Sequence, residues 1–447
     1  MDARWTCLLC ALALSGCDDA PTSDTDEGST GAVTSSSSSG DPTTSQTSSE
    51  TTEGTSSSTG EAEASSGDTS SGGDTSTGTP PCDGFVPGDA FEIAADVSNT
   101  RIHPHAAGDD TGAWFSFVHP EPAGSLFDVS VMHLRCESDV DVPPQVVNTS
   151  PGNDIDASIA VSGERVMVVW NSDDGLGGDS NLQIHGRVLD LSGEPTSDAQ
   201  FRVTTQVAGV DITQNHTLAS VTPTADGFAI SGLRAHPESP AFVAFDQALS
   251  PSGAPTSEAF GAPIEEAVSH LAAFSSRGWL AYGRSGVSSD TVWLAHPDTA
   301  AAAAFDGQPA TAGFILDRPD APGAPLLAGT LGSGNALDIG VALGTGTPLV
   351  LGAPGSLEHS PTVAMNEQGA LAVVFHRNIA GLNNAVVFQR LAVEGDAVVA
   401  VGEAEELDTQ SPPYPASLTW TPGGWLATWS RGSSPDFTTW GRVLAER

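Results

Sequence analysis

Lysine is absent from this chain of 447 residues, and all fifteen of its basic residues are arginine. The absence excludes mechanisms that need a lysine amine, including the Walker A phosphate loop, Schiff-base catalysis, kinase-type phosphoryl transfer and Ser-Lys hydrolysis. The chain also has no His-Glu-x-x-His motif, and residues 82–447 contain no Gly-x-Ser-x-Gly and no Gly-x-Gly-x-x-Gly that follows an expected strand. No common catalytic signature is therefore present.

Positive charge is scarce throughout the sequence. The formal net charge is -41, and the part after residue 81 carries about -29. Such a charge repels phosphate backbones and anionic lipid head groups, which argues against nucleic-acid binding. It favours cations, basic proteins or neutral glycans as partners.

The N-terminus combines a short apolar run with a small-residue cleavage pattern, Leu14-Ser15-Gly16-Cys17. The run is too short to span a bilayer and has the length of a secretory signal. Small residues directly before a cysteine resemble the lipobox of bacterial lipoproteins. The resemblance implies that residues 1–16 are a signal peptide and that Cys17 carries several acyl chains, palmitate among them. The alternative is an ordinary secretory signal whose last residue happens to be cysteine.

Residues 17–81 consist of the lipidated cysteine and a segment of Ser, Thr, Gly, Asp and Glu with almost no large apolar side chain. Such a segment cannot bury enough apolar surface to offset the entropy of ordering, so we expect a disordered tether. A glycosylated stalk is the alternative interpretation. Together, anchor and tether place the protein in the bacterial cell envelope, either at the outer membrane and cell surface or facing the periplasm.

Cysteine is rare after the tether, where only Cys82 and Cys136 remain. An even pair in an oxidising compartment predicts a disulfide between them. Two buried free thiols are the alternative.

Residues 82–447 repeat a pattern of about fifty residues, in which short β-branched or aromatic runs alternate with Gly, Pro, Asp and Ser. One unit contains four expected strands, at 158–161, 166–170, 182–189 and 201–203. Four strands cannot cover both of their faces, so neighbouring units must stack radially. About seven units fit, which predicts an all-β fold, a β-propeller of about seven four-stranded blades.

The ring of blades needs a closing strand. Residues 92–95 look like the fourth strand of a unit but precede the first unit, whereas the last unit stops after 440–444. We therefore expect the N-terminal strand to complete the last blade. The domain, 82–447, is expected to be a monomer.

Parts of this domain resemble repeats found in bacterial secreted and surface β-propellers. The matching segments are 168–175, 184–190, 193–195 and 439–444. The resemblance implies a fold rather than an activity, since propellers host enzymes, receptors and scaffolds.

Four oxygen-bearing side chains gather in one glycine-rich loop: Asp173, Asp174, Asp179 and Asn181. Ca²⁺ prefers such ligands, although the spacing departs from an EF-hand loop and lacks its closing Glu. A bound calcium ion and a solvated acidic turn are the two interpretations. No other cofactor is indicated.

Six polar residues fall near the start of the first strand of their units: His103, Asp154, His216, His270, His359 and Tyr414. First strands line a propeller axis, so these side chains could ring one channel mouth and bind a transition metal or a polar ligand. Alternatively, each satisfies loop backbone within its own blade. The tryptophans of second strands, Trp114, Trp170, Trp279 and Trp429, are expected to be core between blades.

Three classes of function fit these features. A membrane-tethered binding or adhesion module comes first, with a protein or glycan partner, because the anchor, the tether and the repeats present a surface. A periplasmic scaffold for envelope assembly comes next, because Asp18 follows the lipidated cysteine. A carbohydrate-active lyase or hydrolase with acidic and histidine groups at the channel mouth is the third.

Overall fold

The structure, a computed structural model, describes residues 84–447 apart from internal gaps. The gaps are 98–104, 121–125, 150–151, 174–181, 197–199, 204–215, 236–241, 258–259, 262–273, 277, 285–289, 319–320, 322, 334–335, 380–383, 412–413, 434–435 and 447. Cys17, the signal, the tether and Cys82 therefore lie outside the described residues.

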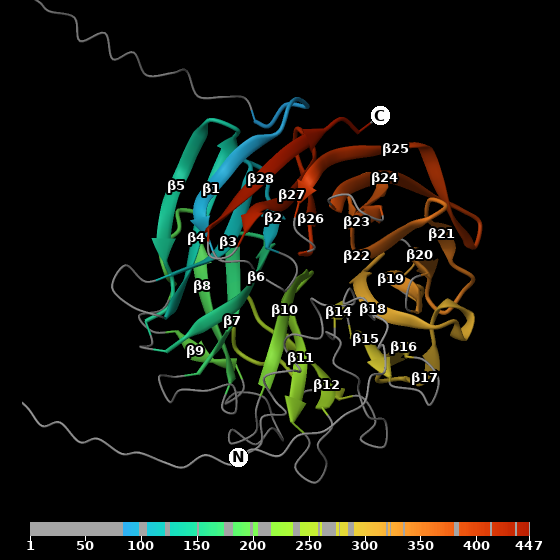
Figure 1. The fold of residues 1–447 in the computed structure, drawn as a ribbon. Helices are drawn as coiled ribbons and strands as arrows, with labels where there is room; N and C mark the ends of the chain where they lie inside the picture. Colours follow the sequence, from blue (N-terminus) through green and yellow to red (C-terminus); the bar gives the residue numbers. More distant parts are fainter. Residues whose placement is uncertain are drawn as a thin grey trace, which may run out of the picture. The chain divides into compact units, whose positions relative to one another are not determined.

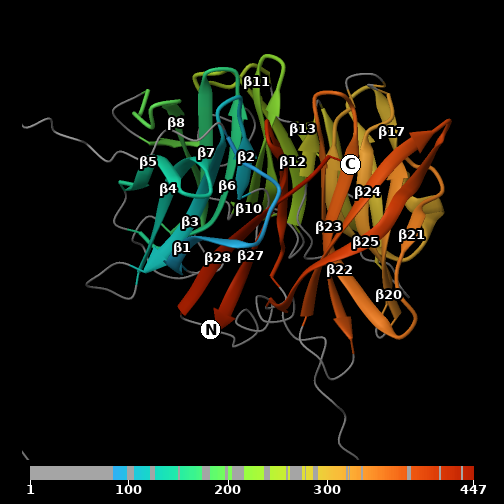
Figure 2. The same cartoon turned by 90° about the horizontal axis from the view of Figure 1, so that it is seen from above.

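Seven four-stranded antiparallel sheets form a β-propeller (Figures 1 and 2), as the repeats predict. Blades 1 to 3 contain β2 (Ala106–Gly108), β3 (Ala113–Pro120), β4 (Phe127–Cys136) and β5 (Asp139–Val146); β6 (Asp154–Ser162), β7 (Arg165–Ser172), β8 (Gln183–Asp190) and β9 (Phe201–Arg202); and β10 (His216–Thr224), β11 (Gly227–Ala235), β12 (Phe242–Leu249) and β13 (Phe260–Gly261).

Blades 4 to 6 continue the same order. They contain β14 (Phe274–Ser276), β15 (Trp279–Arg284), β16 (Thr291–His296) and β17 (Thr299–Ala303); β18 (Ala310–Leu316), β19 (Leu326–Ser333), β20 (Ala336–Leu343) and β21 (Leu349–Leu351); and β22 (Ser356–Met365), β23 (Leu371–Ile379), β24 (Asn384–Glu394) and β25 (Ala397–Ser411). The first strands of successive blades contact one another in turn around the axis, and β26 of the last blade contacts β2 of the first.

The N-terminal strand closes the ring. Blade 7 has the order β1-β28-β27-β26, in which β1 (Phe91–Val97) is the outer strand beside β28 (Asp436–Leu444), β27 (Gly424–Ser433) and β26 (Ser417–Thr421). Phe91 pairs with Gly441. The segment before β1 is also fixed, because the Gly88 amide donates to the Val443 carbonyl at 3.2 Å. The predicted closure is therefore confirmed.

Both faces of each inner strand are covered, so these strands are near-continuous apolar runs rather than alternating ones. Every residue of β7 after Arg165 is buried. Trp114 and Trp170 pack in one core cluster and Trp429 in another, which confirms them as core between blades. Trp279 packs, partly buried, against a third cluster.

The first strands of blades 2, 3 and 6 share an irregularity. Their pairing shifts register between Ile155 and Ser158, between Thr217 and Ser220, and between His359 and Thr362. In two of these blades the extra residue has a left-handed backbone, with φ of 56° at Asp156 and 55° at Ser360. A β-bulge of this kind redirects the side chains that precede it.

Cys136, the last residue of β4, is disulfide-bonded. Every other cysteine of the chain lies outside the described residues, so its pairing with Cys82 stays a prediction.

Candidate functional site

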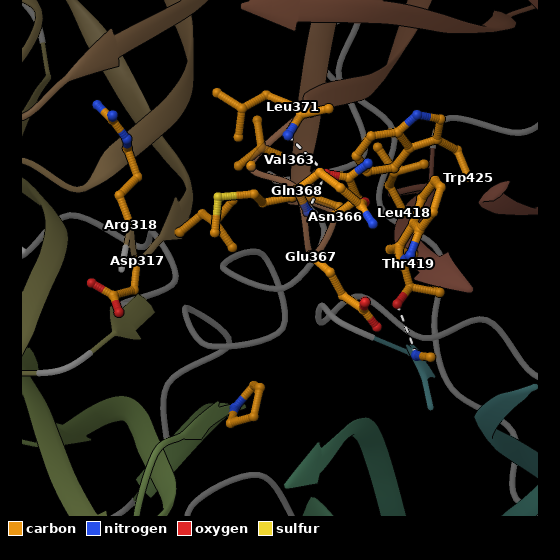
Figure 3. Close-up of a pocket in the computed structure, with 18 of the residues that line it drawn as sticks. Asp317, Arg318, Val363, Asn366, Glu367, Gln368, Leu371, Leu418, Thr419 and Trp425 are labelled. Atoms are coloured by element: carbon orange, nitrogen blue, oxygen red, sulfur yellow. Dashed lines mark hydrogen bonds between the residues drawn. The ribbon is translucent and has the colours of Figure 1, made fainter. Parts of the chain in front are cut away.

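A cavity of about 1280 Å³ lies around the axis (Figure 3). Its walls come from the last residues of β2, β6, β10, β18, β22 and β26 and from the turns that follow them, and in blade 6 it extends outward along β24 and the start of β25. Side chains such as Ile159, Val363 and Leu418 make the walls apolar. A concave, mainly apolar site with a few polar groups is the usual form of a ligand pocket.

The polar groups of this axial cavity are mostly acidic. The lining includes five carboxylates and two guanidinium groups: Asp109, Asp110, Asp317, Glu367, Glu446, Arg318 and Arg390. Figure 3 shows Asp317 and Glu367 on opposite sides of the opening. The excess negative charge favours ligands that present neutral or cationic groups.

Asn366 fixes the turn that carries Glu367 and Gln368 to the cavity. Its Oδ1 accepts hydrogen bonds from the backbone N–H of Gln368 at 3.1 Å and from the backbone N–H of Ala370 at 2.7 Å. Its Nδ2 donates to Glu446 at 3.0 Å. A buried side-chain amide that uses both its oxygen and its nitrogen in this way holds a turn rigidly. The backbone of Glu367 and Gln368 is therefore fixed.

Asp109 organises the blade 1 side of the cavity. Its carboxylate accepts hydrogen bonds from the Thr111 and Gly112 amides and from the Trp114 indole, and lies 3.3 Å from His133 Nε2. Burial raises the pKa of Asp109, but hydrogen bonds from His133 and Thr111 outweigh burial and hold that pKa well below its ordinary value. The group is therefore a fixed anion.

Gly108 allows blades 1 and 7 to meet beside the cavity. A Cβ at this position would collide with the backbone carbonyl of Trp420, and the Gly108 amide donates to Thr419 Oγ1 at 2.8 Å. Only glycine permits this approach.

None of the three channel-mouth candidates whose side chains the structure describes, Asp154, His359 and Tyr414, lines this cavity. They precede or begin the first strands, whereas the cavity lies where these strands end. His103 and His270 lie outside the described residues, and the His216 side chain is not described although the residue begins β10.

The remaining members occupy different positions along their strands. Asp154 and His216 each lie four residues before the first pair after the bulge, whereas His359 lies three before it, and Tyr414 lies three before Ser417. The six residues therefore do not share one strand position, and one residue of offset changes the direction of a side chain.

Asp154 is an internal anchor of its blade. It is fully buried, and its two carboxylate oxygens accept from the Trp170 indole at 3.1 Å and the Asn148 amide at 2.6 Å. These partners are side chains rather than the loop backbone that the alternative interpretation expects.

His359 and Tyr414, by contrast, lie near each other through His376. The His359 and His376 rings stack with centroids 5.5 Å apart, and His376, which is fully buried, also lies beside the Tyr414 backbone. Burial lowers the pKa of His359 to about 4. Burial, together with the neighbouring His359, lowers the pKa of His376 to about 3. Both imidazoles are thus uncharged at neutral pH.

Of the predicted calcium ligands, only Asp173 is described, and its Oδ1 accepts from the Asn153 amide at 2.8 Å. Asp174, Asp179 and Asn181 lie outside the described residues. Within the described part of the chain, no group of three or more His, Cys, Asp or Glu side chains is placed to hold a metal ion. That part also contains no helix long and apolar enough to span a bilayer.

Sequence reasoning missed two arginines, Arg377 and Arg431, which lie toward the C-terminal ends of the second strands β23 and β27. Arg377 and Arg431 each lie six residues after the first core residue of β23 and β27, Leu371 and Trp425. Aligning the second strands of the repeats would have revealed this shared position.

No protein-family model and no curated protein matches the sequence. Among solved structures, the chain is similar to an ulvan lyase of a new polysaccharide lyase family (10% identity, TM-score 0.47, covering 81% of this chain and 96% of that one). It is also similar to Trypanosoma rangeli sialidase (9%, 0.41, 81% and 58%) and to an endo-arabinase from Bacteroides thetaiotaomicron (12%, 0.40, 69% and 99%). Likenesses this weak say nothing about what the chain binds or does.

Proposed function

We propose that this chain is a lipid-anchored binding module of the cell envelope, whose partner inserts a neutral or basic group into the axial cavity. The cavity itself carries the proposal. It is about 1280 Å³ in volume, its walls are largely strands, and two of its acidic groups, Asp109 and Glu446, accept defined hydrogen bonds. Preorganised sites of this kind bind without paying the cost of ordering loops.

Occlusion of the cavity tests this function. Gln368 is an exposed cavity residue on the β22–β23 turn, so Gln368→Trp fills the opening without disturbing the core. Glu164→Trp is the matched control, because Glu164 is an exposed residue on the β6–β7 turn that does not line the cavity.

The full chain and both variants are applied in detergent to one array of neutral and acidic oligosaccharides and basic peptides. We expect a ligand that binds to the wild type and to Glu164→Trp and loses about tenfold or more in affinity with Gln368→Trp. Ligands that all bind equally to Gln368→Trp contradict the proposal.

A carbohydrate lyase or hydrolase is the second candidate function. Its support is the stacked pair His359 and His376, whose pKa values of about 4 and about 3 make them weak bases, so a role in proton transfer would need acidic conditions. The arginine Arg377 and the buried carboxylate of Glu358 lie beside it. Release of unsaturated or reducing ends from a panel of polysaccharides, lost in His359→Ala, supports an enzyme; products that persist in that variant contradict it.

A further inference from the structure

Arg377 and Arg431 are built in the same way in neighbouring blades. Arg377 Nε donates to Glu358 at 3.0 Å and Arg431 Nε donates to Asp408 at 2.6 Å. Both carboxylates are almost fully buried, whereas the arginine side chains are 20% and 29% exposed. The carboxylate therefore fixes each guanidinium at its Nε edge.

An aromatic ring fixes each group a second time. The Arg377 guanidinium lies 5.8 Å from the ring of Phe375, and that of Arg431 lies 3.9 Å from the ring of Trp440. Asp408 also accepts a hydrogen bond from the Trp429 indole, so this carboxylate keeps its place independently of Arg431. The terminal nitrogens of both arginines are left as oriented donors at the surface. Such donors bind carboxylate or sulfate in a bidentate manner, through two hydrogen bonds.

The two groups face the same end of the propeller. Arg377 pairs with Glu358 at the start of β22, the end opposite the axial cavity. Phe375 packs in the cluster of blades 4 to 6, and Trp429 packs in the cluster of blades 6 and 7. Each arginine follows one of these rings by two residues, so the two guanidinium groups are one blade apart.

The surroundings of Arg431 add acceptors to these donors. A cavity of about 370 Å³ is lined by Arg431 together with Glu406, Asp408 and Thr409. Asp408 is almost fully buried and already bonded, so Glu406 is the exposed acceptor beside the guanidinium. Glu406 repels any anion, but the hydroxyl groups of an acidic sugar can donate to it, whereas an acidic peptide without hydroxyl groups meets only the repulsion.

We propose that the end of the propeller opposite the axial cavity holds a binding site for an acidic glycan, in which Arg431 and Arg377 each take a carboxylate or sulfate group of the same chain. This site is separate from the axial cavity and does not depend on the function proposed for it. The donors are fixed before the ligand arrives, and charge-assisted hydrogen bonds are the main contacts.

Binding of defined polymers to the full chain in detergent tests the site. The probes are polygalacturonate, which carries carboxylates; dextran sulfate, which carries sulfates; uncharged dextran; and polyglutamate, which carries carboxylates without hydroxyl groups. We expect saturable, salt-sensitive binding of polygalacturonate, dextran sulfate or both, and much weaker binding of dextran and polyglutamate. Which of the two binds identifies the acidic group.

The variants assign the binding to the two arginines. Arg431→Gln is combined with Asp408→Asn, and Arg377→Gln with Glu358→Gln, so that no buried carboxylate is left without its cation. Each should weaken binding by about tenfold or more, while the melting temperature confirms folding. Arg431→Lys, which keeps the charge but loses the planar guanidinium and its paired donors, should weaken binding too.

Arg442→Gln is the matched control. Arg442 is 27% exposed, but its guanidinium is already occupied by Glu405 at 2.8 Å and by the Gly88 carbonyl at 2.9 Å. It should bind as the wild type does, and so should Gln368→Trp, which blocks the other end. No saturable binding of either acidic polysaccharide, equal binding of polyglutamate, or an equal loss in Arg442→Gln overturns the proposal.

Discussion

At the scale of single residues, the stacked pair of the partly buried His359 and the fully buried His376 couples folding to pH. Their pKa values are about 4 and about 3 in the folded chain, below the ordinary value of 6.5. An unfolded chain therefore binds these protons first as pH falls. The stabilising contribution is complete above about pH 6.5 and is lost progressively between that value and the folded pKa values.

Replacing His376 should remove part of this acid sensitivity. His376→Leu fills a similar volume and cannot be protonated, so between pH 7 and pH 5 its unfolding free energy should fall by about 2 kcal/mol less than that of the wild type. Chemical denaturation at the two pH values measures the difference. His119→Leu, at a partly exposed histidine of β3, is the control and should keep the wild-type dependence. An unchanged pH dependence in His376→Leu means that this residue is not the group involved.

At the scale of elements, β1 holds the ring closed by pairing with β28 along its length. Phe91, Ile93 and Val97 bury their side chains against blades 1 and 7, where Phe85 also packs. Removal of 82–97 should therefore expose an unpaired edge on β28, open the ring and lower the melting temperature of the whole domain. Removal of 20–75 should leave the melting temperature unchanged.

Thermal unfolding of both truncations under reducing conditions tests this closure, because the missing Cys82 then has no effect through a disulfide. Equal melting temperatures for the two truncations contradict a closing role for β1.

The elements were predictable and the site largely was not. Strand count, blade order and the closing strand follow from the fifty-residue repeat and from the position of residues 92–95, since each is a matter of hydrophobic pattern. The bulge at Asp156 and Ser360 carries no sequence signal. It occurs at the same place in both blades, and Asp154 differs from His359 in position and partners because Asp154 lies four residues before the first pair after the bulge and His359 lies three before it. The arginines at 377 and 431 depend on acids that come from different strands, β22 and β25, a pairing that only the fold reveals.

At the scale of the whole molecule, the two ends of the propeller differ in chemistry. One end opens into the acidic axial cavity, and the other carries the fixed guanidinium groups of blades 6 and 7. A propeller whose two ends differ in chemistry can bind two partners at once if the membrane that anchors it does not cover either end. If residues 17–81 form the tether that their composition predicts, roughly 60 residues of flexible chain have a reach of about 45 Å, enough to leave both ends accessible.

We propose that Cys17 anchors the chain, so its loss should release the protein. Buried acyl chains contribute about 0.8 kcal/mol per methylene, so several chains hold a protein on a membrane almost permanently, whereas the acidic domain has no attraction for anionic head groups. Cys17→Ser should therefore move the chain from the membrane fraction to the soluble fraction or leave it unprocessed. Fractionation of cells with detergent partitioning and mass measurement of the N-terminus distinguish these outcomes, with Cys10→Ser as the control inside the signal. A Cys17→Ser protein that is processed and partitions into detergent as the wild type does would show that the chain is held by something other than this cysteine.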